Sequence, residues 1–186
     1  MGEASHDETG WRSGPWRVAA WSAAACLMAL PVGVQLASGD FGWTLGDFIF
    51  VAVVLLAGCF LFDLAARKSP NLSYLLGAAA ALAAGFGLIV VNGAVGLVGS
   101  EDEAHNLVFL VVVLVAIGGA VAARGRPEGM ARAMTAAALA HIAVSAALLV
   151  QAGGRSDGDP LMEVVGLSVF AAVWLASAWL FRIADL

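Results

Sequence analysis

Hydrophobic residues occur along this chain in six long runs, separated by short segments rich in polar residues, glycine and proline. A helix needs about 20 mostly apolar residues to cross the hydrocarbon core of a bilayer. Each run is close to that length, so each predicts one membrane-spanning helix. The predicted spans are residues 16–37, 43–66, 72–99, 107–123, 130–152 and 161–184. The pattern predicts an all-α protein, an integral membrane bundle of about six transmembrane helices.

The segments outside the runs divide the chain further. Residues 1–14 are rich in glycine, serine and charge, and offer little apolar surface to bury. Such a composition predicts a disordered tail, whereas residues 15–186 are expected to form a single transmembrane helical domain. The third run is longer than the hydrocarbon thickness requires, so its helix is expected to tilt or to project from the membrane.

Composition agrees with a membrane location. Of the 186 residues, 61% are hydrophobic and 12% are charged, and the mean hydropathy is +0.91. A soluble domain of this size must cover its core with polar groups, which this chain lacks, whereas in lipid the apolar side chains face outward. The net charge is −5, and no basic surface is indicated, so nucleic-acid binding has no support.

The basic residues predict the orientation. With six spans, eight of the nine lysines and arginines fall on one side of the membrane, and only Arg155 falls on the other. The eight are Arg12, Arg17, Arg67, Lys68, Arg124, Arg126, Arg132 and Arg182. Because basic loops stay on the cytoplasmic side, both termini, including the tail of residues 1–14, are expected in the cytoplasm.

Small residues recur at four-residue spacing in two of the runs. The third run carries Gly77, Ala81 and Gly85, and the fifth carries Ala133, Ala137, His141 and Ser145. In lipid, helices associate by close packing through such smooth faces. These two helices are therefore expected to pack against neighbours rather than to be surrounded by lipid, although a composition rich in alanine and glycine also produces such spacings.

A few ionisable or amide side chains fall inside the predicted spans, where polar groups are costly. Asp63 and Arg67 are spaced for an ion pair within one helix. Asp47 is placed to stabilise a helix start, with a role in binding as the alternative. Asn92 is expected to hydrogen-bond a neighbouring helix. His141 is expected to do the same, and the alternative is ligation of a haem or a metal.

The segment after the third run has the highest concentration of polar and ionisable side chains that could bind a ligand. It contains three glycines at three-residue spacing, followed by Ser100, Glu101, Asp102, Glu103, His105 and Asn106. Ser100 and Glu103 fit a helix capping box, which predicts an ordinary solvated loop. Carboxylates and a histidine also suit a divalent cation, and a partner-docking surface is a third hypothesis. A site here would lie on the outer side of the membrane and would combine Asp47, Asn92, Glu101, Asp102 and His105.

The stretch Val91-Asn-Gly-Ala-Val-Gly-Leu-Val-Gly-Ser-Glu-Asp102, with Asn106 and the later Gly129-Met-Ala-Arg-Ala133, resembles a family of small multi-pass bacterial membrane proteins of uncharacterised function. Their shared motif is V-N-x-A-V-G-x-x-G-S-E-D. The resemblance covers a third to a half of the chain. It implies a multi-pass protein of the bacterial inner membrane and implies no activity. The family pattern often has asparagine where this chain has Glu103.

The sequence favours three classes of function to different degrees. A non-enzymatic membrane subunit or scaffold, in contact with lipid and assembled as a homo-oligomer or with another membrane protein, fits the few buried charges and the small-residue faces. A small transporter or channel for an ion or solute, with an outward-facing polar site, is the alternative. An enzyme is the least supported class, because no H-E-x-x-H, G-x-S-x-G, C-x-x-C or P-loop motif occurs. No cofactor is predicted, and a divalent cation or haem remains an alternative.

Overall fold

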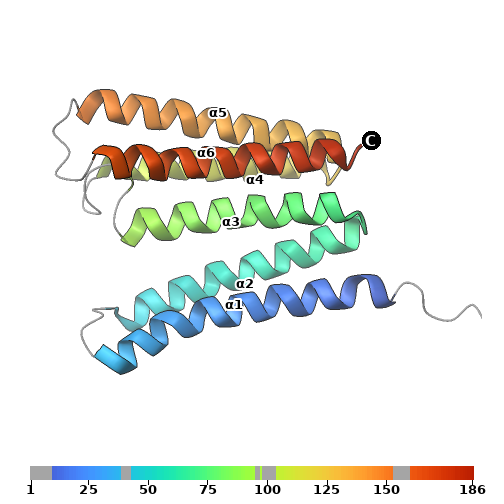
Figure 1. Ribbon diagram of the computed structural model, residues 1–186, viewed down its shortest axis with the longest axis horizontal. Helices are drawn as coiled ribbons and strands as arrows, with labels where there is room; N and C mark the ends of the chain where they lie inside the picture. Colours follow the sequence, from blue (N-terminus) through green and yellow to red (C-terminus); the bar gives the residue numbers. More distant parts are fainter. Residues whose placement is uncertain (1–9, 39–42, 95–96, 98–103, 153–159) are drawn as a thin grey trace, which may run out of the picture. The chain divides into compact units, whose positions relative to one another are not determined.

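The computed structural model describes residues 10–38, 43–94, 97, 104–152 and 160–186. Every secondary-structure element in these ranges is helical (Figure 1). The elements are α1 (Gly10–Ser38), α2 (Leu45–Lys68), α3 (Leu72–Ala94), the 3₁₀-helix η1 (Ala104–Val108), α4 (Phe109–Ala123), α5 (Pro127–Ala152) and α6 (Pro160–Ile183). The predicted all-α fold class is confirmed.

Within the described ranges, six helices are long and apolar enough to cross a membrane. The spans are Pro15–Ala37, Leu45–Lys68, Leu72–Gly93, Asn106–Ala123, Pro127–Gln151 and Leu161–Ile183. Each matches one of the six hydrophobic runs, as expected for a polytopic membrane protein. This agreement arises because the length of an apolar run and the length of a spanning helix are set by the same bilayer thickness.

Two helix ends differ from the apolar runs. α1 begins at Gly10 rather than at residue 16, so that residues 10–14 are helical; residues 1–9 of the expected tail lie outside the described part. α3 ends at Ala94 rather than at residue 99. Residues 93–99 contain three glycines, Gly93, Gly96 and Gly99. A glycine destabilises a helix by about 1 kcal/mol relative to alanine. Of the predicted residues 95–99, the structure describes Leu97, which lies in a bend and not in the helix.

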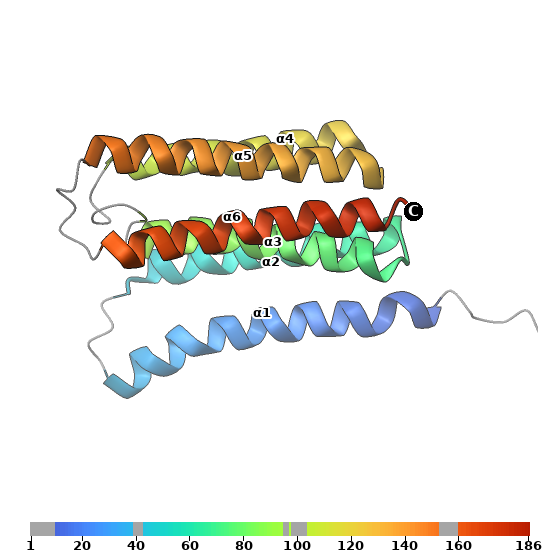
Figure 2. The same cartoon turned by 45° about the horizontal axis from the view of Figure 1, so that its top comes forward.

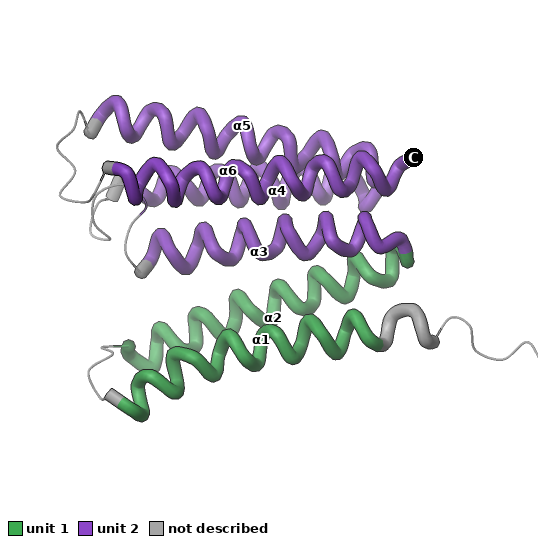
Figure 3. The backbone as a smooth tube through the Cα atoms, viewed as in Figure 1, with its two compact units in different colours: residues 1–70 green, residues 71–186 purple. Residues whose placement is uncertain are grey.

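The chain divides into two compact units, Met1–Pro70 and Asn71–Leu186 (Figure 3). The first contains α1 and α2, which pack against each other as a hairpin. Among its described residues, the buried side chains belong to α2 and include Val51, Leu55 and Phe62. The prediction of one transmembrane domain over residues 15–186 stays a prediction.

The second unit is a four-helix bundle. α5 packs against both α4 and α6, and α6 also packs against α3. Figure 2 shows α4 and α5 in one layer and α3 and α6 in the other. Large side chains fill the space between the helices, and the largest fully buried ones are Trp174, Phe109, Phe181, Leu88 and Met134. This interior holds the buried polar groups of the unit in fixed positions.

A tight turn joins α4 to α5. Arg124 caps α4 in the left-handed region with φ of 52°, and Gly125 follows with φ of 74°. Pro127 then begins α5, where its missing N–H costs nothing. The hydroxyl of Tyr74, in the first turn of α3, donates a hydrogen bond of 3.1 Å to the carbonyl of Gly125. Tyr74 also stacks edge-on against Phe181 of α6, so the start of α3, this turn and the end of α6 meet at one end of the unit.

Candidate functional site

The residues of the predicted outer site fall in different parts of the chain. Asp47 lies at the start of α2 in the first unit, and Asn92 lies near the end of α3 in the second. Glu101 and Asp102 lie outside the described residues, together with Ser100 and Glu103 of the expected capping box. His105 lies in η1, where the structure describes its backbone but not its side chain. The predicted cation site therefore stays a prediction.

Asp47 is engaged at the start of its own helix. Its Oδ2 accepts hydrogen bonds from the backbone N–H of Thr44 at 2.7 Å and from the Thr44 hydroxyl at 2.8 Å. The Thr44 hydroxyl in turn accepts a bond of 3.4 Å from the backbone N–H of Asp47. This reciprocal arrangement is a capping box, and it satisfies backbone donors that the first turn leaves without partners. The prediction that Asp47 stabilises a helix start is confirmed.

Asn92 joins α3 to the segment that precedes α4. Its side chain is buried, and its Nδ2 donates a hydrogen bond of 3.1 Å to the carbonyl of Asn106 in η1. The expected hydrogen bond from Asn92 to a neighbouring element is confirmed. Its Oδ1 is buried and accepts no hydrogen bond from a described residue. The amide therefore fixes the start of α4 beside the end of α3.

His141 lies in the centre of the second unit. It is fully buried, and its Nε2 lies 3.0 Å from the carbonyl oxygen of Leu167 in α6. Phe109 of α4 and Phe170 of α6 flank the imidazole, with ring centroids 5.5 and 6.0 Å away. The expected interhelical hydrogen bond is confirmed, and the residue connects α5 with α6 while contacting α4. Its Nδ1 has no hydrogen-bond partner among the described residues.

A second interhelical bond connects α6 with α3. The hydroxyl of Ser177 is fully buried and donates a hydrogen bond of 2.7 Å to the carbonyl of Gly77. A Cβ placed on Gly77 would lie 3.2 Å from the ring of Phe181, and one on Gly85 would lie 3.8 Å from Trp174. The small-residue face of α3 therefore accommodates two large rings of α6, as the prediction of helix packing requires.

The small-residue face of α5 is likewise buried. Ala133, Ala137 and Ser145 are each less than a tenth exposed. At the α4 contact, a Cβ added to Gly119 would fall 2.6 Å from the Cβ of Ala133. No side chain larger than hydrogen fits at Gly119 without moving a helix, so α4 and α5 approach each other as closely as their backbones allow. The prediction that α5 packs against neighbouring helices is confirmed.

Asp63 forms a charge cluster at one end of the first unit. Its Oδ2 accepts a hydrogen bond of 3.0 Å from Nε of Arg67 and lies 2.9 Å from Nη2 of the same side chain, which confirms the expected pair. Nε of Arg17 in α1 lies 2.5 Å from Oδ1. This second contact is a close approach of charges without the alignment of a hydrogen bond. Asp63 thereby ties the two helices of the hairpin together.

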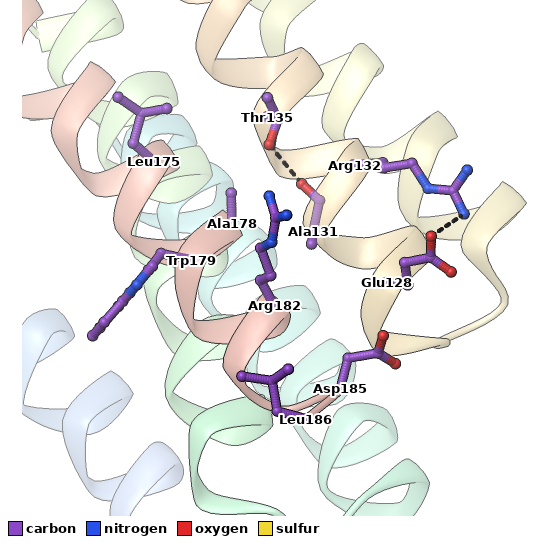
Figure 4. A pocket seen from close by; sticks show the side chains of 10 residues that line it. All are labelled: Glu128, Ala131, Arg132, Thr135, Leu175, Ala178, Trp179, Arg182, Asp185 and Leu186. Carbon is purple, nitrogen blue, oxygen red and sulfur yellow. Dashed lines mark hydrogen bonds and ion pairs between the residues drawn. The ribbon is translucent and has the colours of Figure 1, made fainter.

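A groove runs between the first turns of α5 and the last turns of α6, at the same end of the unit as the α4–α5 turn (Figure 4). It has a volume of about 520 Å³. Four charged side chains line it: Glu128, Arg132, Arg182 and Asp185. The remaining lining is mainly apolar, and contains Ala131, Leu175, Ala178, Trp179 and Leu186, with the hydroxyl of Thr135. The groove therefore combines four charged side chains with a mainly apolar lining.

The sequence interpretation missed three of these features. These are the contact of Arg17 with Asp63, the hydrogen bond of Ser177 to Gly77, and the grouping of charged side chains in the groove between α5 and α6. Each depends on residues far apart in the chain, such as Gly77 and Ser177, which are 100 positions apart. Only the spacing of a serine four residues before Phe181, opposite a glycine ridge, hinted at such a bond, and that signal is weak.

Comparison with known proteins gives no match: no protein-family model, no curated protein and no solved structure matches this chain. The resemblance to small bacterial membrane proteins thus stays a prediction. Among the side chains that the structure describes, no three of His, Cys, Asp or Glu gather closely enough to hold one metal ion. The described residues offer buried polar links between helices and the groove between α5 and α6.

Proposed function

We propose that this chain is a multi-pass protein of the bacterial inner membrane, with both termini in the cytoplasm, that serves as a non-enzymatic subunit or scaffold. In this role it assembles through helix packing with further copies of itself or with another membrane protein. The resemblance of residues 91–102 to small multi-pass bacterial proteins belongs to the same proposal.

The proposal rests on the hydrogen bonds that buried polar side chains make to neighbouring elements. Asn92, His141 and Ser177 each bond the backbone carbonyl of an adjacent element, and large apolar side chains fill the space around them. A conduction path requires polar groups or water in series through the membrane. Polar groups that connect neighbouring helices one by one support a structural role instead.

Further support comes from α1. None of the residues in the most apolar part of its span is buried, and Leu27, Leu30 and Leu36 are between 46% and 83% exposed. A single-chain transporter would be expected to enclose its helices around a path, whereas a subunit keeps helix surface for contacts with lipid or with another chain. Within the hairpin of α1 and α2, α1 thus leaves apolar surface for such contacts.

A transporter for an ion or small solute is the second candidate. It is favoured by Nδ1 of His141 and Nε1 of Trp174, which are buried and have no hydrogen-bond partner in the described part of the chain. Such atoms are the places where a bound water or solute would be held during passage. The two candidates make opposite predictions about assembly and flux.

The deciding experiment isolates the chain from its own membrane in a mild detergent and measures its mass and composition by native mass spectrometry. The proposal expects a defined assembly with fixed stoichiometry. In parallel, the purified chain in sealed vesicles is expected to give no saturable flux of ions or small solutes. A monomer with saturable flux that a His141→Phe variant loses would contradict the scaffold role and establish transport.

A further inference from the structure

The groove between α5 and α6 contains charges that the fold does not use. Glu128 and Arg132 form an ion pair of 3.1 Å within α5. Arg182 and Asp185 line the same groove, and neither side chain makes a hydrogen bond or ion pair with any other residue that the structure describes. One guanidinium and one carboxylate are thus available in the groove.

The position of the groove suits a membrane lipid. Arg132 and Thr135 lie in the first turns of a predicted span, and Trp179 and Arg182 lie in the last turns of another, at the depth where the headgroup region meets the hydrocarbon. Trp179 is 62% exposed. Tryptophan at this depth places an amphipathic ring beside glycerol and the first carbons of the acyl chains.

The apolar residues that line the groove also suit the acyl chains of a lipid. Ala131 and Ala178 are buried small residues on the two facing helices, and Leu175 lies about one turn further along α6. Figure 4 shows the Arg182 side chain reaching between α5 and α6 toward Ala131, with Asp185 nearer the end of α6. A ligand seated here would meet both charged and apolar side chains.

The balance of charge identifies the headgroup. The groove carries two cationic side chains, Arg132 and Arg182, and two anionic ones, Glu128 and Asp185, so its formal charge is zero. An anionic lipid would gain Arg182 but would leave Asp185 facing a phosphate. A headgroup with both a phosphate and a primary ammonium satisfies both free groups, because the guanidinium donates to the phosphate and the ammonium donates to the carboxylate.

We propose that this groove binds one molecule of phosphatidylethanolamine, with its phosphate on Arg182, its ammonium on Asp185 and an acyl chain along Leu175 and Trp179. The site goes beyond the scaffold role and requires only that α5 and α6 cross a membrane. The lipid would fill the open contact between these two helices and stabilise their ends against each other.

The test begins with delipidated full-length chain, tagged at the N-terminus, in a neutral detergent. Dioleoyl phosphatidylethanolamine, phosphatidylcholine and phosphatidylglycerol are added separately, and bound lipid is counted by native mass spectrometry. Phosphatidylethanolamine is expected to bind about tenfold more tightly than phosphatidylglycerol, and about threefold more tightly than phosphatidylcholine, whose quaternary ammonium donates no hydrogen bond. Equal binding of all three lipids would mean nonspecific lipid contact and would overturn the proposal.

Two variants assign the headgroup contacts. Arg182→Gln is expected to weaken phosphatidylethanolamine binding about tenfold. Asp185→Asn is expected to reverse the preference, so that phosphatidylglycerol binds more tightly than phosphatidylethanolamine. Arg126→Gln is the matched control, because Arg126 is exposed and lies outside the groove, and it should leave all three affinities unchanged. Melting temperatures of the lipid-free variants verify that the fold is intact.

The opposite results are equally clear. Tightest binding of phosphatidylglycerol to the unmodified chain would replace a zwitterion site by an anionic one. An unchanged lipid preference in Asp185→Asn would remove the assigned ammonium contact. Displacement of the lipid by an equal concentration of soluble glycerophosphoethanolamine would show that the apolar wall contributes nothing. Each of these outcomes would overturn the proposal.

Discussion

The hairpin of α1 and α2 and the bundle of α3 to α6 both contain helices long and apolar enough to cross a membrane, yet they are held together differently. The bundle connects its helices through buried polar bonds at His141 and Ser177 and through close backbone approach at Gly119. In the described part of the hairpin the interhelical links include the charge contact of Arg17 with Asp63 and a long contact of Cys59 Sγ with the carbonyl of Ala20 at 3.7 Å. No residue in the most apolar window of α1 is buried.

The difference between the hairpin and the bundle reflects the forces that hold helices together in lipid. Hydrocarbon gives apolar surfaces no preference for each other over the lipid tails, so apolar run length alone decides that a helix spans and not what it contacts. Packing depends on shape and on polar links. The bundle has both along its length, whereas the contact of Arg17 with Asp63 lies near one end of the hairpin. We expect the bundle to behave as a rigid body and the hairpin to open more readily.

The largest expected effect is at the closest approach in the bundle. Gly119→Ala should destabilise the chain by about 1–3 kcal/mol, because the new methyl group collides with Ala133 and two packed backbones must separate. The neighbouring Gly118→Ala is the matched control, since its Cβ would meet nothing within 4 Å. Reversible unfolding with SDS, followed by circular dichroism, measures the difference. Equal stability of the two variants would refute the tight α4–α5 contact.

An intermediate effect is expected from the α3–α6 link. Ser177→Ala should lower the free energy of unfolding by about 0.6–1.7 kcal/mol, the range of interhelical hydrogen bonds in membranes. Ser168→Ala provides the comparison on the same helix, because the Ser168 hydroxyl is exposed and bonds the carbonyl of Val164 within α6. The same SDS titration is expected to leave this second variant close to the unmodified chain. A larger loss in Ser168→Ala would contradict a special role for the link to Gly77.

The smallest effect is expected in the hairpin. Arg17→Gln removes the charge contact between α1 and α2, which at its half-exposed position contributes about 0.2–1 kcal/mol. The buried Cys59 thiol lies beneath α1, whereas Cys26 is exposed. Alkylation of Cys59 by a membrane-permeant reagent, relative to Cys26, should become about 1.4- to fivefold faster.

Arg67→Gln is the control for the hairpin, because its ion pair with Asp63 lies within α2 and does not connect the two helices. It should leave the alkylation ratio unchanged, and neither variant should alter the unfolding of the bundle. Faster alkylation in Arg67→Gln than in Arg17→Gln would show that the intrahelical pair, rather than the contact with Arg17, keeps the hairpin closed.

The sequence predicted the six spans because each is encoded by a contiguous apolar stretch. It also predicted the pair of Asp63 with Arg67, which lie one turn apart, and the structural use of Asn92 and His141, since a buried polar group in lipid needs a partner. It did not predict which partner. Leu167 and Asn106 accept through their backbone carbonyls, and every residue has one, so no side-chain pattern marks the acceptor.

Helix ends were predicted less well for a related reason. The apolar run continues to Gly99, whereas α3 ends at Ala94 and Leu97 lies in a bend. Side-chain hydropathy therefore predicts a longer helix than the backbone forms. The groove was missed because Arg132 and Arg182 come together only once α5 and α6 are antiparallel neighbours. Of the expected outer site, the structure accounts for Asp47 as a cap, and the remaining acidic residues lie in 98–103, outside the described part.

The bond between the Ser177 hydroxyl and the carbonyl of Gly77 sets an order of events during synthesis. The two residues are 100 positions apart, which a ribosome covers in roughly 5–20 s. For that interval α3 must stay in the bilayer without its later neighbour α6. It can wait, because a helical backbone satisfies its own carbonyls in hydrocarbon and its residues 72–91 carry no charge. The polar member of the pair arrives last, so the bundle closes only when its final helix has been made.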